Sequence, residues 1–163
     1  MKNSVKRKGF TLVELLIVIV VIGILSAMMM MSSTEAVTSA RASNVVSNLR
    51  NLKTAALALY TDSMDHFYDA THEPTIAQVQ GYLNSGTNVS DGNSYDIEVS
   101  ASTNTETAGS WFLKCQIKGT TDELNRIKAK LKGRASSTGL LNSAASKTVV
   151  YDGSGTTIYM HVR

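Results

Sequence analysis

The chain has 163 residues and a formal charge of +3, from 16 basic and 13 acidic side chains. Four of the cations lie within the first eight residues, and without them the balance is 12 basic against 13 acidic, or −1. The excess positive charge is therefore local to the N-terminal end and does not indicate nucleic-acid binding. A single cysteine excludes an intramolecular disulfide, and the length allows one small globular domain beside an apolar helix.

The segment from Phe10 to Met31 is apolar and carries one charge, Glu14. As a helix it would reach about 33 Å, close to the thickness of a bilayer core. A charge inside a membrane helix costs about 2.5–3.5 kcal/mol, so a functional role is expected for this carboxylate. No Lys or Arg follows the apolar segment before Arg41. This asymmetry predicts that the basic end, with Lys6, Arg7 and Lys8, stays in the cytoplasm.

A secretory signal peptide does not fit, because no small-residue cleavage site follows the apolar run at a usable distance. A plain signal anchor explains neither Gly9-Phe10 nor Glu14. Residues 8–18, KGFTLVELLIV, closely resemble the prepilin-peptidase site of type IV pilins and the related pseudopilins. The resemblance implies cleavage after Gly9 and N-methylation of Phe10. It also implies that Glu14 acts in assembly by pairing with the terminal amine of an adjacent subunit.

The same resemblance implies a set of partners. These are prepilin peptidase, other copies of the chain in a helical homopolymer, and a pilus or secretion assembly platform. Before assembly the chain is expected to cross the cytoplasmic membrane once; afterwards it would lie in an extracellular pilus or a periplasmic pseudopilus. No cofactor, no nucleic-acid partner and no enzymatic activity is expected.

The helix is predicted to continue beyond the apolar segment, because residues 32–60 contain neither Gly nor Pro. Its pattern becomes one-sided, with apolar residues at intervals of three and four: Ala42, Val45, Leu49, Leu52, Ala56 and Leu59. Four segments are therefore expected. They are a cleaved leader (1–9), an apolar half-helix (10–31), an amphipathic half-helix (32–62) and a globular head (63–163).

The head is predicted to be α+β. Pro74 opens a short helix at residues 75–83, and the capping box Thr120–Glu123 opens a second helix that ends at Gly133. Apolar and alternating runs predict four antiparallel strands packed on the long helix. The expected strands are 95–99, 111–118, 148–151 and 157–162, the last two forming a hairpin around Asp152-Gly153-Ser154-Gly155.

Other chemistry-bearing residues have plainer interpretations. Five acidic and histidine residues follow one another at helical spacing but match no recognised metal-ligand pattern, so an acidic helix end is the favoured interpretation. They are Asp62, Asp65, His66, Asp69 and His72. Cys115 is expected to be a buried structural thiol. The sequon at Asn88 is attributed to chance. No set of residues forms a credible catalytic site.

The second short helix carries a basic face of five residues: Arg126, Lys128, Lys130, Lys132 and Arg134. A solvated face is the simpler interpretation. The alternatives are contacts with DNA or with the acidic segment 62–69 of a neighbouring copy. The absence of interleaved aromatic residues favours the neighbour.

Three functions remain open from the sequence. A type IV pilus subunit is favoured, because the Asp-Pro-Trp-Gly-like calcium loop of major pseudopilins is absent. A pseudopilin of a secretion or competence system is the alternative within the same family. A single-pass, membrane-anchored binding module is the alternative from another class.

Overall fold

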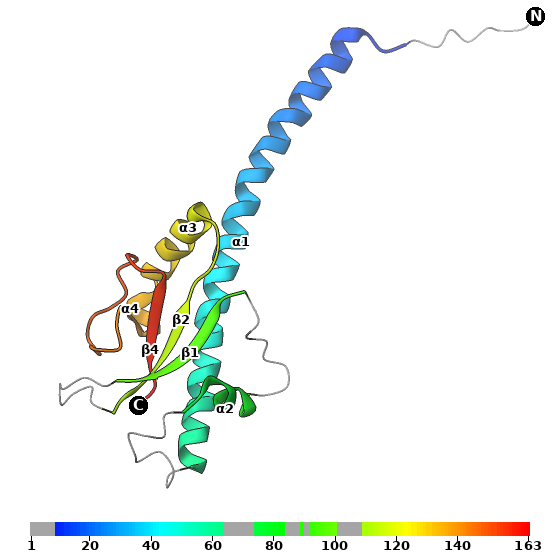
Figure 1. Ribbon diagram of the computed structural model, residues 1–163. Helices are drawn as coiled ribbons and strands as arrows, with labels where there is room; N and C mark the ends of the chain where they lie inside the picture. The colour runs from blue at the N-terminus through cyan, green and yellow to red at the C-terminus, as the bar shows by residue number, and fades with distance from the viewer. Residues whose placement is uncertain (1–8, 64–73, 84–88, 90–91, 101–108) are drawn as a thin grey trace, which may run out of the picture. The chain divides into compact units, whose positions relative to one another are not determined.

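The computed structural model describes residues 9–63, 74–83, 89, 92–100 and 109–163 (Figure 1). The chain divides into two units, which are considered separately: an N-terminal unit, Met1–Val37, and a C-terminal unit, Thr38–Arg163. The residues expected to form an acidic helix end (other than Asp62), the basic leader residues and the sequon at Asn88 lie outside the described residues.

Helix α1 spans Leu12–Asp62 without interruption over 51 residues, as the sequence predicted. In the C-terminal unit its apolar stripe is buried, and all six residues expected on that face are at most 4% exposed. The stripe belongs to a core cluster that also contains Leu113 of the sheet and Ile127 of a later helix. Burial of this one face holds the second half of α1 on the head.

The sheet is antiparallel, with strand order β1-β2-β4-β3. Its strands are β1 (Ser94–Val99), β2 (Trp111–Gln116), β3 (Leu140–Leu141) and β4 (Thr157–His161). The predicted α+β class with a four-stranded antiparallel sheet is therefore confirmed. Because β2 is central, it is buried on both faces, with alternate residues in the α1-side core and Phe112 in a second cluster on the other side. Cys115 is fully buried in the α1-side core, as expected.

Three short helices surround the sheet: α2 (Ile76–Gly81), α3 (Thr121–Lys132) and α4 (Ala135–Thr138). The predicted capping box between Thr120 and Glu123 is present at the start of α3, and Gly133 follows its last residue. Helix α2 is shorter than predicted and begins with a capping box of its own, in which Thr75 is the N-cap. Helix α4 was not predicted, because it has only one turn.

The predicted C-terminal hairpin is wrong. Residues 148–151 do not pair with β4; Leu140 and Leu141 occupy that place, opposite Met160 and Tyr159. Val150 forms an isolated bridge with Leu141 on the outer side of β3. The turn residues 152–155 therefore close a wider loop, in which the buried Tyr151 donates a hydrogen bond from its hydroxyl to the carbonyl of Gly155 at 2.6 Å. A run of only two leucines is too short for its alternation to be recognised as a strand.

His161 lies on the sheet face that points away from α1, opposite Phe112 in β2, and the two rings are 5.2 Å apart in an edge-on arrangement. Its Nε2 atom is buried and has no hydrogen-bond partner among the described residues. Burial lowers the pKa of His161 from its usual 6.5, and the positive charges of Lys147 and Lys53 lower it further. A hydrogen bond with the Arg163 backbone opposes this shift. Protonation is therefore less favourable in the folded chain than in the unfolded chain.

We predict that His161 makes the fold sensitive to acid. Above about pH 6.5 the histidine is neutral in both the folded and the unfolded chain, so it does not affect the free energy of unfolding. As the pH falls below that value, the unfolded chain binds the proton more strongly than the folded chain. The folded chain therefore loses stability as the pH falls. The measurement is the unfolding midpoint of the full chain in detergent at pH 7.5 and pH 5. His161→Gln, which does not titrate, should reduce the difference between the two midpoints. An identical difference in parent and variant would contradict the prediction.

Candidate functional site

The first turn of α1 is closed by a capping box that the sequence analysis did not anticipate. The carbonyl of Thr11 accepts the first helical hydrogen bond, from the Leu15 amide, so Thr11 is the N-cap residue. The Thr11 hydroxyl accepts a bond from the Glu14 amide at 3.2 Å. In return, Oε2 of Glu14 accepts bonds from the Thr11 amide and the Thr11 hydroxyl, each at 2.8 Å. The pattern Thr-x-x-Glu is the sequence signal that would have predicted this arrangement.

The two oxygens of the Glu14 carboxylate are not equivalent. Both bonds from Thr11 end on Oε2, and Oε1 accepts none from the part of the chain that the structure describes. One oxygen therefore fixes the start of the helix. The other oxygen can accept a further bond, and no described residue supplies a cation to it.

Gly9 and Phe10 precede the helix and are exposed, with the Phe10 side chain 89% accessible. A Cβ atom added at Gly9 would meet nothing within 4 Å. The folded chain therefore places no steric demand for glycine at this position. A requirement for glycine here has to come from a molecule that acts on the segment.

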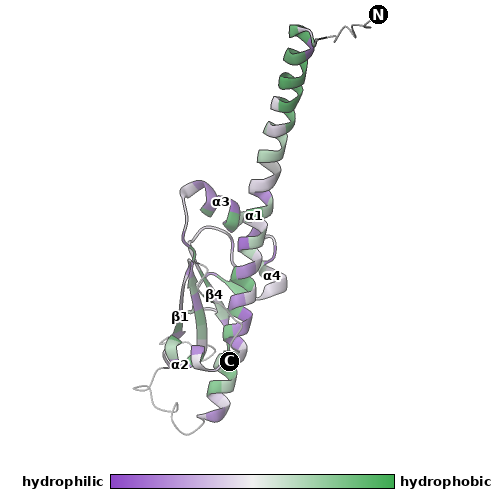
Figure 2. Cartoon of the chain, turned by 90° about the vertical axis from the view of Figure 1, so that its right-hand side faces the viewer, coloured by the Kyte–Doolittle hydropathy of each residue, from purple (hydrophilic) through white to green (hydrophobic). Residues whose placement is uncertain are grey.

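The apolar part of α1 is exposed over its whole circumference within the chain, with Val13, Ile17 and Leu25 each more than half accessible. Figure 2 shows this part of the helix as almost continuously hydrophobic. It is the one helix of the described residues that is long and apolar enough to cross a membrane, judged by length and composition. An apolar surface of this extent requires an apolar environment outside the chain.

A family model described as the prokaryotic N-terminal methylation motif matches residues 5–30. The segment is a methylation motif. It contains Gly9, Phe10 and Glu14, and the resemblance recognised in the sequence is therefore confirmed. No curated protein and no solved structure matches the chain significantly.

The methylation motif is typical of type IV pilins, so the match supports a pilin-like or pseudopilin precursor that prepilin peptidase processes. It suggests a structural protein that is anchored in a membrane before assembly. The motif covers only the N-terminal segment, so it carries no information that separates a pilus from a pseudopilus.

Outside the methylation motif, the other candidate residues do not converge on a site. No group of three or more metal-ligating side chains occurs within the described ranges. Two members of the expected basic face are already bound: Lys128 donates to the Ser154 carbonyl at 3.2 Å, and Arg134 donates to the Ser43 hydroxyl at 2.7 Å. The hydroxyl of Tyr82 donates to Asp62 at 2.5 Å.

We predict that Thr11→Ala loosens the first turn of α1, whereas Thr11→Ser preserves it. Loss of an N-cap hydroxyl typically costs about 1 kcal/mol, or about a fivefold change in local opening. The measurement is hydrogen exchange at the Glu14 and Leu15 amides, which both donate to Thr11, in the full chain in detergent micelles. Equal exchange rates in the alanine and serine variants would show that the capping box does not hold this turn.

Proposed function

We propose that this chain is the precursor of a type IV pilus subunit. In this proposal prepilin peptidase cuts after Gly9, Phe10 becomes the N-methylated first residue, and the mature chain polymerises through α1. The observation that carries the proposal is the methylation motif at residues 5–30, in which basic residues lead into an apolar helix that no other part of the described chain covers.

The surroundings of Gly9 support cleavage at this position. The segment is exposed and precedes the first helical residue, so its backbone is free to enter the active site of a peptidase. The apolar helix would keep the segment at the membrane surface, with Lys6, Arg7 and Lys8 on the cytoplasmic side.

Cleavage would create an α-amine at Phe10, which is largely protonated near neutral pH because its ordinary pKa is about 7.7–8.0. In hydrocarbon, an isolated ammonium group and an isolated carboxylate are both unfavourable, and pairing relieves both. Oε1 of Glu14 accepts no bond from the described chain, and in this proposal it accepts one from the amine of an adjacent copy. This pairing would select the axial position of each incoming subunit.

The alternatives differ in what they assemble. A pseudopilin of a secretion or competence system would share the processing and the Glu14 pairing but would form a short periplasmic fibre. A membrane-anchored binding module would form no filament. Electron microscopy of cells that express the chain together with a pilus assembly machine separates the three, because long surface fibres support the pilus subunit alone.

We predict that Gly9→Leu blocks processing and that Gly23→Leu does not. Neither position has an atom within 4 Å of an added Cβ, so the two variants place the same side chain in equally open surroundings. A defect confined to Gly9→Leu would therefore reflect the peptidase and not the fold. Mass spectrometry of membrane fractions should detect a terminus at Phe10 in the parent and in Gly23→Leu. An intact leader in the assembled parent protein would overturn the proposed cleavage.

We predict that Glu14→Val and Glu14→Gln both reduce filament yield sharply, although both should insert into the membrane and be cleaved. Valine removes the charge and the capping bond. Glutamine removes the charge but can still cap the helix through its side-chain oxygen. If neither variant forms filaments, assembly depends on the charge. If the glutamine variant forms filaments and the valine variant does not, assembly depends on the capping bond.

Filament yield is measured by shearing and electron microscopy, with each variant expressed as the sole subunit. A Glu14→Gln protein that is inserted, cleaved and assembled at parental yield would refute the pairing with the amine.

A further inference from the structure

The charges of the C-terminal unit are segregated along the chain. Residues 54–113 contain eight acidic side chains and no Lys or Arg, whereas residues 114–163 contain nine basic and three acidic side chains. The first segment includes the end of α1, together with α2 and β1, and the second includes α3, α4 and β4. Along the sequence, negative charge is therefore concentrated in the first of these segments and positive charge in the second.

The positive side is centred on α3. Arg126 and Lys132 are exposed, and neither makes a hydrogen bond or ion pair with any residue that the structure describes. Helix α3 is fixed beside the part of α1 that opens the C-terminal unit, by the ion pair between Arg41 and Glu123, at 3.3 Å. The bond from Arg134 to Ser43 holds the following segment at the same level of α1.

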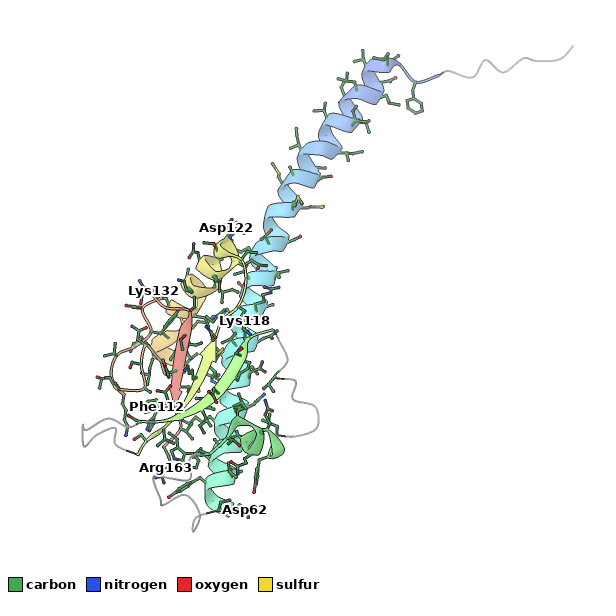
Figure 3. The ribbon with its side chains drawn as sticks, viewed as in Figure 1. Asp62, Phe112, Lys118, Asp122, Lys132 and Arg163 are labelled. Carbon is green, nitrogen blue, oxygen red and sulfur yellow. The ribbon has the colours of Figure 1, made fainter. Side chains whose placement is uncertain are left out.

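The negative side includes the C-terminal end of α1. Asp62 is the last residue of this helix and is exposed. The last turn contains no basic residue of its own, and the cation described beside it is the Arg163 guanidinium, which lies 3.9 Å from the centroid of the Tyr60 ring. Ser43 and Asp62 are nineteen residues apart, which is about 28 Å along a helix. Figure 3 shows Asp62 well separated from Asp122 and Lys132, the labelled residues near the two ends of α3.

We propose that Arg126 and Lys132 of one copy bind the acidic C-terminal end of α1, at Asp62, in the next copy along the helix axis. The proposal rests on the pilin-like polymer proposed above and adds a contact between heads. The α3 cations and Asp62 lie at opposite ends of the part of α1 that belongs to the C-terminal unit (38–62), so a contact between parallel copies is heterologous. A heterologous contact that repeats without closing builds a filament instead of a closed ring.

Charge reversal tests this contact in the full chain, expressed with an assembly machine. The double variant Arg126→Glu/Lys132→Glu should lower filament yield roughly tenfold or more, because attraction becomes repulsion at every repeat. Asp62→Lys should also lower the yield. Combining all three substitutions should restore it substantially, since the charges are then exchanged and not lost.

Three controls isolate the effect. Lys118→Glu/Lys147→Glu makes the same change in net charge at exposed lysines outside α3 and should assemble as the parent does. Tyr82→Phe removes only the hydrogen bond that Asp62 accepts within its own chain, and it should assemble normally. Unchanged melting of the membrane-inserted variants excludes unfolding as the cause.

Cross-linking tests the same contact without requiring filaments. Two tagged forms of the chain, one with Arg126→Cys and one with Asp62→Cys, both in a Cys115→Ser background, are expressed together and treated with a short bismaleimide. We expect a mixed dimer, and a much weaker one when Lys147→Cys replaces Arg126→Cys. If the parent forms no filaments, the proposed function fails while the mixed dimer still decides whether the heads meet.

Two results would overturn the contact while leaving the proposed function intact. One is parental assembly of the α3 double reversal without a mixed dimer. The other is that the α3 double reversal assembles as the parent does but, unlike the parent and the control variants, no longer binds added DNA. The α3 cations would then bind a polyanion and not a neighbouring head.

Discussion

The N-terminal unit is constrained by one carboxylate at the start of an apolar helix. From Phe10 to Met30, α1 exposes apolar side chains on every side, and Glu14 is the only ionisable group among them. Such a surface is stable only in a bilayer or against other apolar helices. In either environment an ionised carboxylate needs partners. Thr11 supplies two bonds to it, and both are compatible with a single copy in the membrane.

The capping box leaves the carboxylate partly satisfied, and this has a consequence for assembly in the proposed function. A side chain with every acceptor position filled would gain little from a neighbouring amine. A side chain with no internal partner would oppose insertion and would rotate freely. Glu14 lies between these extremes, because Oε2 is held while Oε1 remains available. The capping bonds also fix its orientation in advance, which lowers the entropy lost on pairing.

Sequence reasoning succeeded where a pattern extended over several residues. The stripe on α1, the capping box at Thr120 and the strand around Trp111 each have enough repeats or specific neighbours to be recognised. It failed where the structure is set by distant contacts. The two residues of β3 carry no periodicity, and their place beside β4 depends on apolar contacts with Met160 and Tyr159. At the candidate site, the motif predicted Gly9, Phe10 and Glu14 as candidates, whereas the cap at Thr11 was not predicted although the pattern Thr-x-x-Glu is present.

In the proposed polymer, the two contacts between copies differ in the environment that surrounds them. The Glu14–amine pair would lie among apolar helices, where salt does not reach it and the local dielectric constant is low. The contact between α3 and Asp62 would lie at the exposed heads, where ions screen charges beyond about 8–10 Å at ordinary salt concentrations. The buried pair would therefore set the axial register at any ionic strength. The head contact joins charges at opposite ends of the second half of α1, and it would add a salt-dependent preference for parallel neighbours. High salt should loosen the heads while the α1 core of the filament remains intact.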